Sequence, residues 1–281
     1  MRKLIFIGML AVLIGCSSHV KTQMYSNLTT EKEQIEVANI MKSAGINSAY
    51  TFIDWVNDYN SAMRGRAGLA KKWTPLSQID YKTDEMSTLW DEAHSGEMDA
   101  NCRLAAFLLM KDSVTGGKIS DYGNYLMMDM DEIEKNPRYV NFKGDSKKFI
   151  ALFNQVSVAN AKNDADYFNA FTNAWKQRGI AFGNGRASLI SVIMNDSQEK
   201  VLFIGHTGVL IEGNGYLLFI EKLSPTMPYQ VTRYATRKEL KAQLAARPQY
   251  TLGDEDFKTF FMENDKIMAD KPIFSLISEK Q

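Results

Sequence analysis

Two kinds of hydrophobic pattern follow one another along this chain, and their order constrains the fold more than any other feature. Up to residue 186, apolar residues recur mostly at helical spacing. From Ala187 onward they form long runs separated by turn signals such as Gly213-Asn214-Gly215, which predicts strands and hairpins. Because helices come first and strands follow, the sequence predicts an α+β fold, with an N-terminal helical half and then an antiparallel sheet. The expected helices are one between a cap at Thr29 or Thr30 and a stop at Gly45, one around 50–56, and 83–94, 102–110, 129–134, 146–155, 165–177 and 237–246; the expected strands are 188–194, 200–212, 216–222 and 229–234.

The N-terminus has the pattern of an export signal. Arg2 and Lys3 precede an apolar run over residues 4–14. This run is too short to cross a bilayer core of about 30 Å, but it fits a signal-peptide core of about 7–15 residues. Gly15 then precedes Cys16, and polar residues follow, which resembles the processing site of bacterial lipoproteins. The alternatives are an uncleaved anchor and an ordinary signal peptide.

The lipoprotein resemblance implies a domain layout and a location. Residues 1–15 would be the signal peptide, and 16–30 a flexible tether lipidated on Cys16. Residues 31–281 would form a single α+β domain. Acyl chains contribute about 0.8 kcal/mol per buried methylene, so several chains anchor a protein stably. We therefore expect an exported protein whose partner is the membrane, either the bacterial cell membrane or the outer membrane.

The composition excludes one class of partner. The chain has 33 basic and 33 acidic residues, and removing residues 1–15 takes away two basic ones and leaves a net charge of −2. No basic excess is present to neutralise phosphates, which argues against nucleic acid. A hydrophobic fraction of 45% with 11% aromatic residues is enough for a globular core.

No cofactor is expected from the sequence motifs. Cysteines and histidines are too few for a zinc pattern, and the glycine pairs do not fit a phosphate-binding motif. Asp129, Asp131 and Glu132 crowd together and raise the alternative of a cation site. The spacing and glycine of a calcium loop are missing, so we interpret this segment as the start of a helix.

Cys102 is the only cysteine left after lipidation of Cys16. An unpaired thiol outside the cytoplasm is exposed to oxidation, so it calls for a reason. One reason is that it packs as a small buried hydrophobe. The other is chemistry, because Cys102 opens the predicted helix 102–110, and a helix N-terminus favours the thiolate. Asn101 is a natural N-cap residue for that helix.

A thiol nucleophile needs a base, and the chain has three histidines. His19 lies in the predicted tether, and His94 ends a predicted helix. His206 lies in a predicted strand between Gly205 and Gly208, and glycines in strands often mark a close backbone approach or a functional side chain. A histidine among apolar strand residues can also be a satisfied core residue. We select His206 as the candidate base.

Glu221 is the candidate for orienting the imidazole, depending on the register of the hairpin. A two-residue turn at Asn214-Gly215 places His206 opposite Leu223, with Glu221 as the diagonal neighbour on the same face. A three-residue loop places Lys222 opposite His206 and turns Glu221 away. Both strands are apolar on both faces, so the sequence leaves the register open.

Taken together, these segments resemble the papain-like cysteine hydrolases of the NlpC type, which include cell-wall peptidases and amidases. The resemblance rests on Cys102 opening a buried helix and on the strand His206-Thr207-Gly208-Val209-Leu210-Ile211, followed by a turn and a strand with a polar end. It implies a papain-like core in which Cys102 is the nucleophile and His206 the base. Glu221 would hold the ring, although His, Asn or Gln is more usual there. The backbone amide of Cys102 and the side chain of Asn101 are candidate oxyanion donors.

A second similarity covers most of residues 24–270 and is to a family of bacterial surface lipoproteins that carries no established activity. It rests on Asn101-Cys102-Arg103, Phe219-Ile220-Glu221-Lys222, Pro228-Tyr229-Gln230 and Met262-Glu263-Asn264-Asp265. We expect a cell-envelope lipoprotein with a cysteine amidase or peptidase site, and peptidoglycan or another peptide as its partner by location and analogy. The alternative is a non-catalytic lipoprotein of the same fold that binds a ligand or partner.

Overall fold

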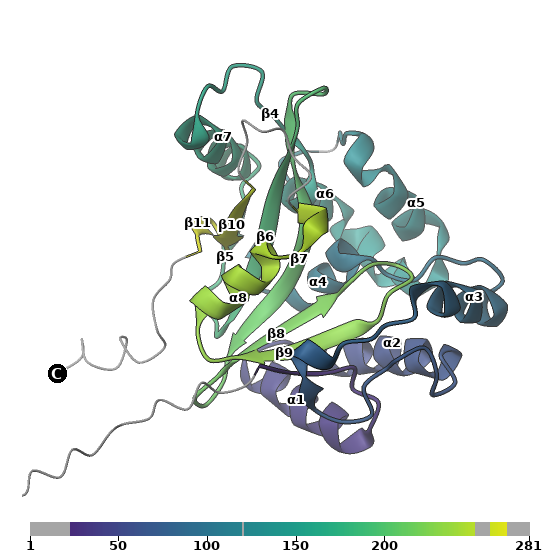
Figure 1. Ribbon diagram of the computed structural model, residues 1–281. Coiled ribbons are helices and arrows are strands. Elements are labelled where there is room, and N and C mark those ends of the chain that lie inside the picture. The colour runs from purple at the N-terminus through teal and green to yellow at the C-terminus, as the bar shows by residue number, and fades with distance from the viewer. Residues whose placement is uncertain (1–22, 120, 251–258, 269–281) are drawn as a thin grey trace, which may run out of the picture.

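The computed structural model describes residues 23–119, 121–250 and 259–268, and a large antiparallel sheet runs through its centre (Figure 1). The strands are β1 Met24–Ser26, β2 Thr74–Pro75, β3 Val114–Thr115, β4 Val156–Ser157, β5 Ala181–Phe182, β6 Ala187–Asp196, β7 Val201–Glu212, β8 Leu217–Lys222, β9 Tyr229–Tyr234, β10 Phe260–Glu263 and β11 Lys266–Ile267. Their order in the sheet is β11-β10-β6-β7-β8-β9-β1-β2, with β4 also paired to β7, while β3 and β5 pair separately.

Most helices precede the long strands. They are α1 Glu31–Ser43, α2 Ala49–Ala62, α3 Thr83–His94, α4 Cys102–Met110, α5 Met127–Lys135, α6 Ser146–Phe153, α7 Asp164–Gln177 and α8 Arg237–Ala245, with 3₁₀ turns η1 Leu76–Gln78, η2 Asn124–Leu126, η3 Pro137–Asp145 and η4 Pro248–Tyr250. The predicted α+β class is confirmed. The predicted bounds of α3 and α4 agree with the structure residue for residue.

Helix α4 begins at Cys102 because Asn101 caps it. The backbone of Asn101 is extended, and its side-chain oxygen accepts the N–H of Leu104 at 3.0 Å. Eight of the nine residues of α4 are buried, which fits a helix that is apolar nearly all round. The predicted capping role of Asn101 is therefore confirmed, and α4 lies inside the molecule.

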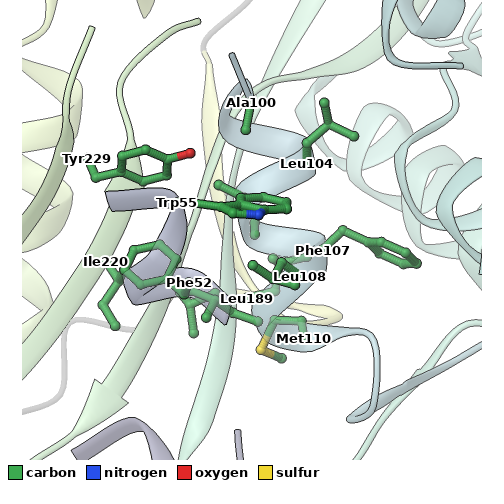
Figure 2. Close-up of a cluster of buried hydrophobic side chains, with 14 of the residues drawn as sticks. Phe52, Trp55, Ala100, Leu104, Phe107, Leu108, Met110, Leu189, Ile220 and Tyr229 are labelled. Atoms are coloured by element: carbon green, nitrogen blue, oxygen red, sulfur yellow. The ribbon is translucent and has the colours of Figure 1, made fainter. Parts of the chain in front are cut away.

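The sheet separates two cores, because side chains alternate between its faces. Figure 1 shows α8 over one face and α4 and α6 behind the other. Figure 2 shows the larger core, in which side chains of α2 and α4 meet those of the strands. Leu189, Val209 and Ile220 belong to this larger core, whereas their neighbours Ile190, Leu210 and Phe219 pack with Leu240 and Leu244 of α8.

A bulge in β7 places His206. Val192 of β6 is opposite His206, but the next residue, Ile193, is opposite Ile204, so Gly205 is the extra residue. A bulge shifts the alternation of side chains by one. Ile204 consequently packs in the larger core, like Val209 beyond the bulge, while His206 turns to the face covered by α8 and η4.

The hairpin between β7 and β8 has the register of a two-residue turn, which is one of the two alternatives that the sequence leaves open. Gly208 is opposite Glu221, and Gly213 donates its N–H to the carbonyl of Tyr216 at 2.9 Å, which closes the turn around Asn214-Gly215. Continuing this register places His206 opposite Leu223, so Glu221 is its diagonal neighbour on the same face.

The N-terminal prediction needs a correction. The sequence predicts a tether over residues 16–30, but Met24–Ser26 form β1, which pairs with both β9 and β2. Leu28 is fully buried, and Thr30 caps α1. The polar, aperiodic sequence hides this short strand because its stability comes from partners that are distant in sequence.

The remaining N-terminal predictions lie outside the described residues. These are the signal peptide 1–15, the lipidation site Cys16 and the first part of the tether. Among the residues that the structure describes, no helix has the length and apolarity needed to span a membrane.

We predict that Gly208→Ala destabilises the protein by about 1–3 kcal/mol, as overpacking in a core commonly does. A Cβ at this position would lie 2.5 Å from the ring of Phe219 and 2.7 Å from the carbonyl oxygen of Ile220. Gly144→Ala is the matched control, because nothing lies within 4 Å of the place that a Cβ would take there. Urea unfolding of the three proteins measures the difference, and equal midpoints for both variants would contradict the prediction.

Candidate active site

The structure brings together two side chains that 103 intervening residues separate in the sequence. The Cys102 thiol, at the N-terminus of α4, lies beside the imidazole of His206 on β7 and the backbone of Thr207, close enough for both to lower its pKa. Both side chains line the same cavity, which has a volume of about 370 Å³. His94 lies elsewhere, because it stacks on Trp90 and contacts Asp58.

Glu221 orients the imidazole from the adjacent strand. Its Oε2 lies 2.7 Å from Nε2 of His206, which leaves Nδ1 as the nitrogen available to the thiol. Arg247 in turn donates two hydrogen bonds to the carboxylate of Glu221, one from Nη1 and one from Nη2, each of 2.7 Å. Gln230 adds a longer contact of 3.4 Å to the same carboxylate. The arrangement is a row of four groups that runs from Arg247 through Glu221 and His206 to Cys102.

The pKa shifts along this row favour alternating charges. Burial alone raises the pKa of Glu221, but the charge and hydrogen bonds of Arg247, with a smaller effect of His206, lower it to about 2. Burial lowers the pKa of His206, but hydrogen bonds to Cys102 and Glu221 outweigh this and raise it above its ordinary value. Burial raises the pKa of Cys102, yet His206, Arg103 and the N–H of Thr207 together lower it. The site therefore favours a thiolate beside an imidazolium.

The ring of His206 is covered by Tyr250 of η4, with ring centroids 5.5 Å apart and planes at 25°. His206 is 2% exposed and Cys102 is 9% exposed. The rest of the cavity combines apolar and polar walls. They are formed by Met98, Asn101, Arg103, Met128, Gly205, Leu223, Ser224, Pro225 and Gln249.

Both the oxygen and the nitrogen of the Asn101 side-chain amide have hydrogen-bond partners. Its oxygen caps Leu104, and its Nδ2 donates to Asp129 at 2.6 Å. One Nδ2 hydrogen remains, because an amide carries two donors. The backbone amide of Cys102 lies in the first turn of α4 and has no acceptor within the helix. Both candidate oxyanion donors therefore stay predictions, and both lie beside the thiol.

A buried ion pair lies next to the site and ties the segment before α4 to β8. Lys222 lies 2.7 Å from Asp99, and both side chains are fully buried. Arg138 also contacts Asp99, at 3.3 Å. Burial lowers the pKa of Lys222 to about 8, although Asp99 opposes this shift. Because Asp99 lies three residues before Cys102 and Lys222 follows Glu221, this pair helps to hold α4 against the sheet.

Sequence reasoning missed Arg247, Tyr250 and the role of Asp129. Arg247 and Tyr250 follow α8, and no local pattern connects them to Glu221 or His206. The sequence places Asp129 in a helix start, and it does lie in the first turn of α5. It is also completely buried, which a single sequence does not reveal. Within the described residues, no group of three or more histidine, cysteine or carboxylate side chains is arranged to hold a metal ion.

A family model described as "Domain of unknown function (DUF4300)" matches residues 24–268. The chain belongs to the DUF4300 family. Searches among curated proteins and among solved structures give no match. The match begins at the first residue of β1 and ends just after β11, so the family domain includes every element of the site.

We predict that Glu221→Gln lowers the free energy of unfolding by about 3–5 kcal/mol at neutral pH, because it leaves Arg247 buried without its partner. The double variant Glu221→Gln, Arg247→Met is expected to regain part of this loss. Glu221 titrates at about 2 when folded, against an ordinary 4.5. Its contribution is therefore complete above pH 4.5 and is lost as the pH falls towards 2.

Urea unfolding of the three proteins at several pH values measures this effect. The gap between wild type and Glu221→Gln is expected to narrow as the pH falls below 4.5. A gap that is absent at neutral pH, or that does not change with pH, would show that the Glu221–Arg247 pair does not have this role.

Proposed function

We propose that this protein is a thiol hydrolase with a papain-like core that cleaves an amide or peptide bond. The observation that carries the proposal is the row Cys102–His206–Glu221, with the thiol at a helix N-terminus and the imidazole held by an ionised carboxylate. A nucleophile in contact with a base, and a base oriented by a third group, is the arrangement that acyl transfer requires. A cysteine-bearing helix packed on an antiparallel sheet that carries the base supports the papain-like assignment.

The acylation step follows from the charge distribution. The Cys102 thiolate attacks the carbonyl carbon and forms a C–S bond, and the carbonyl oxygen becomes an oxyanion. The proposed donors to that oxygen are the backbone amide of Cys102 and the side chain of Asn101 beside it. The imidazolium of His206 gives its proton to the amine nitrogen as the C–N bond breaks. The products of this step are a free amine and a thioester on Cys102.

Water then completes the reaction. His206, now neutral, takes a proton from a water molecule, whose oxygen attacks the thioester carbon. The C–O bond forms, the C–S bond breaks, and a carboxylic acid leaves while the thiolate is restored. Glu221 remains ionised throughout, because Arg247 neutralises it and holds its pKa at about 2. Its role is to keep the ring oriented and to stabilise the imidazolium.

The location follows from the N-terminal sequence. An exported chain with lipid on Cys16 would act at the bacterial cell envelope, anchored to the cell membrane or outer membrane. Peptide bonds of peptidoglycan are then the substrate suggested by location and by analogy with NlpC-type hydrolases.

One observation favours a second candidate function, a lipoprotein that binds a ligand or partner without catalysis. Cys102 is 9% exposed and His206 is 2% exposed, and Tyr250 stacks over the ring of His206. Such limited exposure suits a site in which Cys102 and His206 are structural. The two candidates predict different thiol reactivity.

We predict that iodoacetamide alkylates Cys102 rapidly at neutral pH in a full chain carrying Cys16→Ser, which leaves Cys102 as the only cysteine. His206→Ala is expected to slow this reaction at neutral pH about tenfold or more, because one unit of thiol pKa changes the thiolate fraction tenfold. Rates measured across pH give the apparent pKa. His94→Ala is the control and is expected to leave the profile unchanged. An unreactive Cys102 in the folded wild type would favour the binding candidate.

We also predict that the wild type hydrolyses muropeptides, and that Cys102→Ala reduces the rate by about 10³-fold or more, as loss of a nucleophile does in related mechanisms. Product release measured by chromatography tests this. The His94→Ala variant again serves as the control. Equal rates for wild type and Cys102→Ala would exclude the proposed role of the thiol.

A further inference from the structure

We propose that Asp129 and Arg103 form a positioning pair that holds the nucleophile and the base in register. This inference rests on the proposed function for its catalytic consequence, but its effect on the thiol is measurable without a substrate. Neither residue has to touch the reacting atoms. They act on the two segments that carry Cys102 and His206.

The carboxylate of Asp129 accepts hydrogen bonds from both sequence neighbours of Cys102, which are Asn101 and Arg103. Its Oδ1 accepts from Nδ2 of Asn101 at 2.6 Å and from Nε of Arg103 at 3.2 Å, and its Oδ2 accepts from Nη2 of Arg103 at 2.7 Å. The side chain of Asp129, which belongs to α5, is fully buried. A single carboxylate thus fixes the residues on either side of the nucleophile, and this fixes the first turn of α4.

Arg103 links the same Asp129 carboxylate to β7, the strand that carries His206. Its Nη1 donates to the carbonyl of Ile204 at 3.2 Å, and its Nη2 donates to the carbonyl of Tyr125 at 3.1 Å. Ile204 directly precedes the bulge at Gly205, and His206 directly follows it. The guanidinium therefore bridges the helix of Cys102 and the bulge of β7.

The planar fork of Arg103 is what makes this bridge specific. Four of its five N–H donors are used, and they point to acceptors on three different elements. A lysine keeps the positive charge but has no planar fork, so it cannot reach these acceptors together. The charge of Arg103 also lowers the pKa of Cys102, so charge and position must be separated experimentally.

Two variants make that separation. Arg103→Lys keeps the charge and loses the fork. Asp129→Asn is nearly isosteric and removes a negative charge near the thiol, which on charge alone would favour the thiolate. If the position of Cys102 and His206 governs the reactivity of the thiol, both variants reduce that reactivity at neutral pH. If the charge near the thiol governs it, neither variant does. Asp131→Asn is the matched control, since Asp131 is an exposed residue of the same helix paired with Lys135.

The experiment measures iodoacetamide alkylation across pH in the full chain carrying Cys16→Ser, with near-ultraviolet circular dichroism to verify the fold. We expect Arg103→Lys and Asp129→Asn to slow alkylation at neutral pH about tenfold, with a raised apparent thiol pKa, and Asp131→Asn to match the wild type. In denaturant all four proteins should have the same profile. If Arg103→Lys does not fold, Asp129→Asn decides alone.

A folded Arg103→Lys or Asp129→Asn variant with a wild-type profile would overturn the inference. Failure of the proposed function gives a different result, namely a wild-type thiol whose reactivity does not depend on His206. The two failures are therefore distinguishable in one series of measurements.

Discussion

The buried contact between Arg247 and Glu221 is the interaction on which the rest of the site depends. A carboxylate buried beside an imidazole would otherwise tend to take up a proton, because burial disfavours its charge. Arg247 keeps Glu221 ionised through two hydrogen bonds of 2.7 Å. The ionised Glu221 favours the protonated form of His206, and this in turn favours the thiolate of Cys102. Charges of alternating sign thus extend from Arg247, which directly precedes η4, to Cys102 at the N-terminus of α4.

The sheet makes this row possible by bringing the parts together from distant segments. Adjacent strands β7 and β8 supply His206 and Glu221, and the bulge at Gly205 turns His206 away from the larger core. The α4 helix packs against the same strands and presents Cys102 at its first residue. Buried ion pairs commonly add little net stability, because desolvation offsets attraction. Those around this site are better explained by the geometry and ionisation that they impose.

Much of the fold was predictable because its signals are local. The cap at Asn101 and the apolar run after it defined α4, and glycines at the turn indicated the hairpin. The register of the hairpin was not predictable, because both faces of β7 and β8 are buried and no polar face marks the outside. The strand β1 was missed for a related reason, since three residues in a polar segment form a strand only when β9 and β2 are present.

The residues of the candidate site also divide into those that the sequence could indicate and those that it could not. Cys102, His206 and Glu221 could be selected because their residue types are rare or suited to chemistry in this chain. Arg247, Tyr250 and Asp129 could not, because arginine, tyrosine and aspartate are common and their roles depend on tertiary contacts.

The central claim is that its neighbours lower the pKa of the Cys102 thiol in the folded protein, and the ultraviolet absorbance of the thiolate tests it most directly. The difference between Cys16→Ser and Cys16→Ser, Cys102→Ser proteins isolates the signal of this one sulfur as the pH is changed. The account predicts a transition below the ordinary thiol pKa of about 8.5. A transition at or above that value in the folded protein would contradict it.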